Sequence, residues 1–140
     1  MSAVKIHQLK GATFAARGAS NHWVMMDGKE KVGGSGAASS PMELVLFALG
    51  GCAAIDIEVM MKKMKLPVEN FEIDISSERA EKHPKIYTKI DMVFHFYGKN
   101  LPQKKLERAV SLSRNTYCSV SAMLEKTTKI TATVENHDTA

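Results

Sequence analysis

Short apolar runs alternate with turn residues over the first part of the chain. Each run is β-prone, and Gly, Asn, Ser or Asp residues separate it from the next. This alternation predicts a small antiparallel β-meander over residues 1–32. The Gly- and Ser-rich stretch 33–40 has nothing to bury and is predicted to be a linker or mobile loop. The runs are Val4 with Ile6, Thr13–Phe14 and Trp23–Met26.

A long apolar segment follows and carries a strong helix start. Ser40 is a good N-cap, Pro41 occupies the first helical position, and Glu43 stands three residues after the cap. The residues 44–55 are apolar on every face, which is typical of a helix buried from all sides. We therefore predict a long buried central helix over residues 41–66.

Strand and helix patterns return in the last part of the chain, residues 67–140. Phe71, Ile73 and Ile75 alternate with polar residues, and the run 86–97 forms a longer strand with one apolar face. These two strands are expected to pair as antiparallel neighbours in a second antiparallel sheet. The remaining elements are a helix opening at Leu101–Pro102, a short helix over about 117–125, and a strand over 130–135. The fold class is α+β, in a single domain.

Composition agrees with one folded domain and excludes several classes of protein. The chain has 140 residues, of which 44% are hydrophobic and 24% are charged. A net charge of +4 gives no support for nucleic-acid binding. The first residues lack the pattern of a signal peptide, and the apolar run 44–55 is shorter than a membrane span of about 20 residues. We therefore expect a cytoplasmic protein with no membrane segment.

The two cysteines, Cys52 and Cys118, are the residues most able to carry chemistry. They lie 66 positions apart, so they form no CxxC motif. Cys118 stands at a predicted helix start, where free backbone N–H groups would lower its pKa. Cys52 follows Gly50 and Gly51, which indicate either close approach of another backbone or a local break in the helix. The alternative is that both thiols are small hydrophobic residues of the core.

No motif for a metal or a cofactor is present in the sequence. The five histidines form no HxxxH or HExxH pair, and no phosphate-binding glycine motif follows a strand. We therefore expect neither a metal nor a cofactor. Capping of the helix explains Glu43, which on an unbroken helix would lie about 13 Å along the axis from Cys52.

Three segments together resemble the OsmC/Ohr family of osmotically induced and organic-hydroperoxide-resistance proteins. They are Ser40-Pro41-Met42-Glu43-Leu44, Gly50-Gly51-Cys52-Ala53-Ala54-Ile55-Asp56 and Tyr117-Cys118-Ser119-Val120. The resemblance covers essentially the whole chain and is closest to the small OsmC-like branch. It implies an α+β fold in which two chains intertwine into a homodimer with two active sites at the subunit interface.

The resemblance also implies a thiol peroxidase that reduces organic hydroperoxides. Cys52 matches the peroxidatic position, whose sulfur becomes a sulfenic acid, and Cys118 matches the resolving position, which forms a disulfide with it. A dithiol reductant would then reopen the disulfide. An apolar pocket lined by the central helix would suit an alkyl or lipid hydroperoxide.

Two features depart from the family pattern. Family members usually carry a glutamate directly after the proline, where it orients an activating arginine, but here Met42 holds that position and Glu43 follows it. The arginine normally comes from the partner's meander, in which Arg17 is the only arginine, and Arg79 and Arg114 are the substitutes. Two further functions therefore stay open: a dimer that binds an apolar ligand, and a redox-switchable dimer without turnover.

Overall fold

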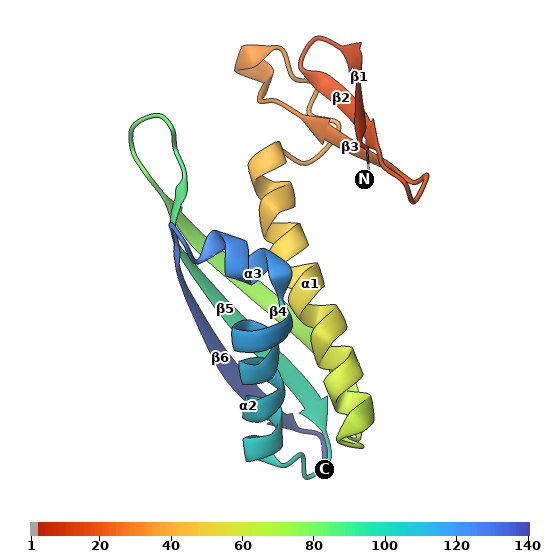
Figure 1. The fold of residues 1–140 in the computed structure, drawn as a ribbon, viewed down its shortest axis with the longest axis vertical. Coiled ribbons are helices and arrows are strands. Elements are labelled where there is room, and N and C mark those ends of the chain that lie inside the picture. Colours follow the sequence, from red (N-terminus) through yellow and green to blue (C-terminus); the bar gives the residue numbers. More distant parts are fainter. Residues whose placement is uncertain (1–2) are drawn as a thin grey trace. The chain divides into compact units, whose positions relative to one another are not determined.

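The chain divides into two compact units, Met1–Phe47 and Ala48–Ala140. The structure is a computed structural model that describes residues 3–140, so the first two residues of the predicted meander segment lie outside it. Helix α1 (Pro41–Lys63) begins in the first unit and continues into the second (Figure 1).

The first unit contains the predicted meander. Strands β1 (Lys5–Lys10), β2 (Thr13–Arg17) and β3 (Trp23–Asp27) form an antiparallel sheet in that order, and a 3-10 helix, η1 (Glu30–Val32), follows. The turn between β1 and β2 uses Gly11 at φ +55°, where a Cβ atom would lie 2.6 Å from the carbonyl oxygen of Gly33. Only glycine fits this turn.

The glycine-rich loop after η1 is anchored by the buried carboxylate of Asp27. This carboxylate accepts hydrogen bonds from the N–H of Ala37 at 2.8 Å, the N–H of Ser35 at 3.0 Å and the hydroxyl of Thr13 at 2.9 Å. These bonds, led by the one from Ala37, hold the pKa of Asp27 below its ordinary value. The segment predicted as a linker or mobile loop is thus tied to β2 and β3.

Helix α1 begins at the predicted residue and runs without interruption through its two glycines. Its cap forms as expected, because the hydroxyl of Ser40 accepts a hydrogen bond from the N–H of Glu43 at 3.2 Å. Because α1 is one continuous helix from Pro41 to Lys63, the predicted alternative of a local break at Gly50 and Gly51 is wrong. A Cβ atom on Gly50 would lie 3.0 Å from Cδ1 of Ile75, so the close neighbour is a side chain rather than another backbone.

The prediction that α1 is buried from all sides is wrong for the single chain. One side is covered, whereas Ile55 is 69% exposed and Val59 is 43% exposed. At 23 residues α1 is also long and apolar enough to cross a membrane by length and composition alone, so the length argument against a span does not hold. Its covered side packs in the core of the second unit, as expected of a core helix. The buried residues are Leu49, Ala53, Ile57, Met60 and Met61.

The second unit is built on a mixed sheet rather than the predicted antiparallel one. Its strands are β4 (Val68–Arg79), β5 (Tyr87–Gly98) and β6 (Lys129–Asp138), in that order. The predicted antiparallel pairing of β4 with β5 is confirmed, but β6 runs parallel to β5. A helical crossover brings the chain back from the end of β5 to the end of the sheet at which β5 begins, as parallel pairing requires. The crossover contains α2 (Gln103–Leu112), a π-helical turn η2 (Ser113–Tyr117) and α3 (Ser119–Leu124).

The core lies between this sheet and its helices. The predicted apolar face of β5 is fully covered, since Ile90, Met92, Phe94 and Phe96 are at most 1% exposed. Figure 1 shows the C-terminal part of α1 together with α2 and α3 on one face of the sheet. Because side chains alternate along a strand, the residues between these four point to the opposite face of the sheet.

Candidate active site

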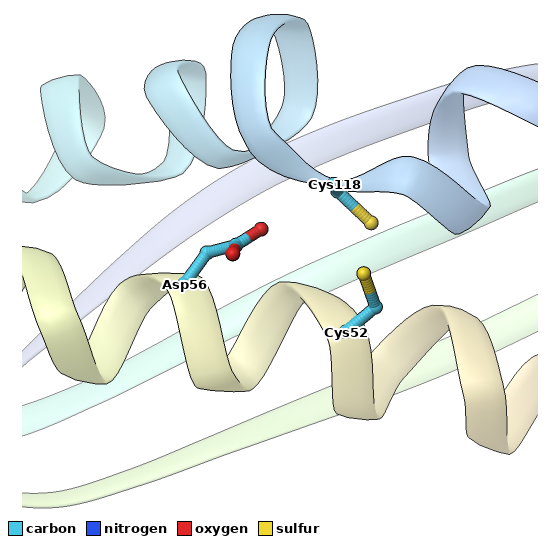
Figure 2. A group of neighbouring side chains, drawn as sticks. All are labelled: Cys52, Asp56 and Cys118. Carbon is cyan, nitrogen blue, oxygen red and sulfur yellow. The ribbon is translucent and has the colours of Figure 1, made fainter.

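The fold brings the two cysteines together within the second unit. Cys52 lies half-buried on α1, and Cys118 lies at the N-terminus of α3, where it is 3% exposed. Figure 2 shows their sulfur atoms pointing toward each other. The two sulfurs and a carboxylate oxygen of Asp56 all lie within 4.8 Å of one another. The two thiols, remote in sequence, therefore lie close together in the second unit.

The π-helical turn before α3 positions Cys118. The N–H of Cys118 donates to the carbonyl of Ser113 at 2.8 Å and closes this turn. Cys118 then adopts an extended backbone, and its sulfur caps α3 by accepting a hydrogen bond from the N–H of Ser121 at 3.4 Å. Single π-helical turns occur often at functional sites because they redirect one residue out of a regular helix.

The prediction that the helix start lowers the pKa of Cys118 is wrong. Burial is the main cause that raises the pKa of this thiol to about 11, and the neighbouring Cys52 and Asp56 contribute in the same direction. The hydrogen bond from Ser121 acts in the opposite direction but is outweighed. Because α3 has only six residues, its dipole is also short. Cys118 is consequently a protonated thiol at neutral pH.

Asp56 is a site residue that the sequence analysis missed. It follows Cys52 by four positions on α1, so the two side chains lie on the same side of the helix. Its carboxylate accepts a hydrogen bond from the hydroxyl of Ser113 at 3.1 Å, which links α1 to the π-helical turn. This spacing from Cys52 was the available signal, but in the sequence Asp56 was noted only as the last residue of the segment Gly50–Asp56 that resembles the family.

The two substitute arginines of the second unit are engaged elsewhere. Arg79 lies over the ring of Tyr87, at 5.8 Å from its centroid. Arg114 donates to the hydroxyl of Ser121 and to the carboxylate of Glu125, both at 2.7 Å. Of the two, Arg114 connects to the site only indirectly, because Ser121 in turn donates its N–H to the Cys118 sulfur.

The other two predicted site residues belong to the first unit. Arg17 ends β2, with its guanidinium 4.8 Å from the centroid of the Trp23 ring. Glu43 lies in the first turn of α1, where its N–H takes part in the cap. The roles of Arg17 and Glu43 in the chemistry of the cysteines stay predictions.

The three facing side chains also form a set of donor atoms that a thiophilic metal could use. Two sulfurs and one carboxylate oxygen are close enough to share an ion. Metal binding requires thiolates, however, and the raised pKa of Cys118 opposes loss of its proton. The arrangement therefore favours thiol chemistry over a resident metal.

Comparison with known proteins identifies the family. Residues 33–133 match the family model of the OsmC-like protein, and the chain belongs to that family. The matched span contains Cys52, Asp56 and Cys118.

Individual relatives agree with this assignment. Protein YhfA of Escherichia coli strain K12 is 40% identical over 131 residues, which cover 94% of this chain and 95% of YhfA. A solved structure of an Aquifex aeolicus protein is 31% identical with a TM-score of 0.84, covering 97% of this chain and 96% of that one. An organic hydroperoxide resistance protein OsmC from Legionella pneumophila is 16% identical, with a TM-score of 0.72 and 96% of each chain covered. The predicted family and the α+β fold class are confirmed.

Proposed function

We propose that the protein is a cytoplasmic thiol peroxidase that reduces organic hydroperoxides in defence against oxidative stress. The observation that carries the proposal is the facing pair of sulfurs, contributed by α1 and by the start of α3. Membership of the OsmC-like family supports it, and so does the name of the related Legionella protein, which describes resistance to organic hydroperoxides.

The proposed cycle begins at Cys52, the more exposed of the two thiols. Its thiolate attacks one oxygen of the hydroperoxide, the O–O bond breaks, and the alkoxide takes up a proton and leaves as the alcohol. The sulfur is oxidised to a sulfenic acid. The sulfur of Cys118 then attacks the sulfenic sulfur, a disulfide forms, and water leaves. A dithiol reductant supplies two electrons and two protons to restore both thiols.

The high pKa of Cys118 argues against this thiol as the one that attacks peroxide in the first step of the cycle. A buried, protonated thiol reacts slowly with peroxide, because the thiolate is the reactive form. Cys118 therefore stays reduced until Cys52 has been oxidised. Its sulfur lies no more than 4.8 Å from that of Cys52, so a local movement brings the two to the bond length of about 2.05 Å.

We further propose that the protein acts as a homodimer in which Arg17 and Glu43 activate Cys52. The family resemblance implies these two roles. The exposed apolar side chains of Ile55 and Val59 on α1 support a partner chain, because large apolar groups clustered on one helix face are rarely left in water.

The direct test follows the loss of cumene hydroperoxide in the presence of dithiothreitol. The native protein should consume peroxide with turnover, whereas Cys52→Ser should reduce the rate to that of reductant alone. Cys118→Ser should still be oxidised at Cys52, but without a disulfide between the two positions. Equal rates for the native protein and Cys52→Ser would contradict the proposal, provided that both show the same thermal unfolding.

A second candidate is a dimer of the same fold that binds an apolar ligand. Asp56 favours it, because a carboxylate rather than a positive charge lies beside the two thiols in the second unit. Native mass spectrometry separates the two candidates. A co-purified apolar molecule, together with thiols that do not react with peroxide, would support ligand binding over peroxidase activity.

A further inference from the structure

A cluster of two histidines and one glutamate lies on the face of the second sheet opposite to the core. His95 of β5 is the register partner of Glu135 in the parallel neighbour β6. His137 follows Glu135 by two positions, so both side chains project from the same face of β6. Parallel pairing thus gathers three potential metal ligands at one place on the sheet.

The three donor atoms are close enough to share one ion. Nδ1 of His95 lies 2.9 Å from Nε2 of His137, and Oε2 of Glu135 lies 4.0 Å and 3.8 Å from these two nitrogens. These three atoms form a triangle, and the point at equal distance from all three lies about 2.1 Å from each atom. This distance is the usual length of a bond from zinc to an imidazole nitrogen or a carboxylate oxygen.

Neighbouring side chains orient both imidazole rings. Nε2 of His95 lies 2.9 Å from Oδ2 of Asp74 on β4, and a proton held on that nitrogen leaves the lone pair on Nδ1. That lone pair accepts a hydrogen bond from Nε2 of His137, which a bound metal would replace. The His137 ring stacks on Tyr97 with the centroids 4.5 Å apart. The side chain of His95 is only 16% exposed, so its ring is held in place. A carboxylate behind a ligating imidazole is the usual support of a zinc site.

We propose that His95, Glu135 and His137 form a binding site for a divalent transition metal of the zinc type, with Asp74 as a positioning residue. Two imidazole nitrogens and one carboxylate oxygen suit Zn²⁺, whereas Mg²⁺ and Ca²⁺ prefer a shell made only of oxygen. The three ligands leave a fourth position open to water or to a ligand. This site is independent of the proposed peroxidase activity.

The proposal departs from the sequence-based expectation that no metal is bound. That expectation rested on the spacing of the histidines along the chain, and His95 lies 42 positions from His137. Only the parallel pairing of β5 with β6 brings them together. The local signal was Glu135 two positions before His137, because this spacing places both residues on the same face of a strand.

Calorimetric titration with Zn²⁺ tests the site. The full-length Cys52→Ser/Cys118→Ser double variant is used, so that the thiols cannot bind the ion. We expect one equivalent of Zn²⁺ per chain, bound in the micromolar range or tighter, and no binding of Mg²⁺. Adding His137→Gln or Glu135→Gln should weaken binding at least about tenfold, whereas adding His83→Gln should leave it unchanged.

Two further measurements distinguish the loss of a metal ligand from a general change in the fold. Asp74→Asn should weaken Zn²⁺ binding about tenfold while leaving the stoichiometry unchanged, because it removes the carboxylate behind His95 but no ligand. In NMR spectra, Zn²⁺ should shift the imidazole resonances of His95 and His137 and leave those of His83 in place. Absence of binding to the double variant would overturn the proposal, and so would binding that survives both His137→Gln and Glu135→Gln.

Discussion

At the scale of single residues, the different roles proposed for the two thiols are argued from their surroundings. Cys118 caps a helix, yet its hydrogen bond from Ser121 is 3.4 Å long and the side chain is almost fully removed from water. Loss of solvation therefore outweighs the favourable bond, and the pKa rises to about 11. Cys52 is the more exposed of the two, so the proposed peroxide substrate is expected to reach its sulfur and not that of Cys118.

Replacing Asp56 by asparagine should make Cys118 more reactive. The negative carboxylate is one cause of the raised pKa of Cys118, and asparagine removes the charge while its amide oxygen can still accept from Ser113. In a Cys52→Ser background, Asp56→Asn should increase the rate of alkylation of Cys118 by iodoacetamide several-fold near pH 9. The rate is read from the alkylated peptide by mass spectrometry.

The matched control for this substitution is Glu58→Gln, on the same helix. The carboxylate of Glu58 pairs with Lys62 in solvent, at 3.2 Å, so its removal should leave the alkylation rate unchanged. Equal rates for Asp56→Asn and Glu58→Gln would show that Asp56 does not act on the thiol.

Both cysteines could be recognised as candidates from the sequence, but the predicted direction of the pKa shift of Cys118 was wrong. Their residue type and setting marked them as candidates, and the resemblance paired them. A lowered pKa of Cys118 was predicted only because this residue stands at the start of a predicted helix. Burial depends on side chains from distant segments, so no local pattern around Cys118 shows that desolvation dominates.

At the scale of elements, the buried side chains of α1 are expected to stabilise the second unit. Ile57 is fully buried. Ile57→Ala should lower the free energy of unfolding by about 2–5 kcal/mol, because it removes apolar contacts and leaves a cavity. Ile86→Ala is the control, since Ile86 is 44% exposed just before β5 and its truncation should cost less than about 1 kcal/mol. Urea denaturation measures both, and equal losses would contradict this account of the core.

The buried Asp27 should make the first unit sensitive to acid. Its pKa is lowered in the folded state, so the ionised carboxylate stabilises the fold at every pH above the ordinary carboxyl pKa of about 3.9. That contribution is lost as the pH falls through the lowered value. Asp27→Asn should therefore be less stable at pH 7 and should show a flatter loss of stability below about pH 4.

Thermal melts between neutral and acid pH measure this effect. Glu81→Gln is the control, because Glu81 is exposed in the loop that joins β4 and β5. A melting temperature for Asp27→Asn that equals that of the native protein at both ends of the range would show that the loop does not depend on this carboxylate.

The elements themselves were largely predictable, but their directions were not. The cap at Ser40 and the alternation of Ile90, Met92 and Phe94 are local patterns, and both are confirmed. The direction of β6 depends on the end of the sheet at which the helical crossover delivers the chain. The pattern of residues 130–135 contains no information on that direction. The histidine cluster was missed for the same reason.

At the scale of the whole molecule, the exposed side of α1 is expected to be covered by a second chain. A charge placed there should prevent association without unfolding the chain. Ile55→Lys should therefore shift the protein from dimer to monomer in sedimentation velocity, because Ile55 is 69% exposed in the single chain. Lys62→Ala, near the end of the same helix, is the control and should stay dimeric. A monomeric native protein would contradict the proposed dimer.

The central claim is that Cys52 and Cys118 act as one redox pair, and intact-mass analysis of the native protein tests it most directly. After treatment with cumene hydroperoxide without reductant, the account predicts that each chain loses the mass of two hydrogen atoms. Proteolytic peptides should then show Cys52 bonded to Cys118, and dithiothreitol should reverse the change. Two free thiols after treatment, or oxidation of Cys118 with Cys52 intact, would contradict the account.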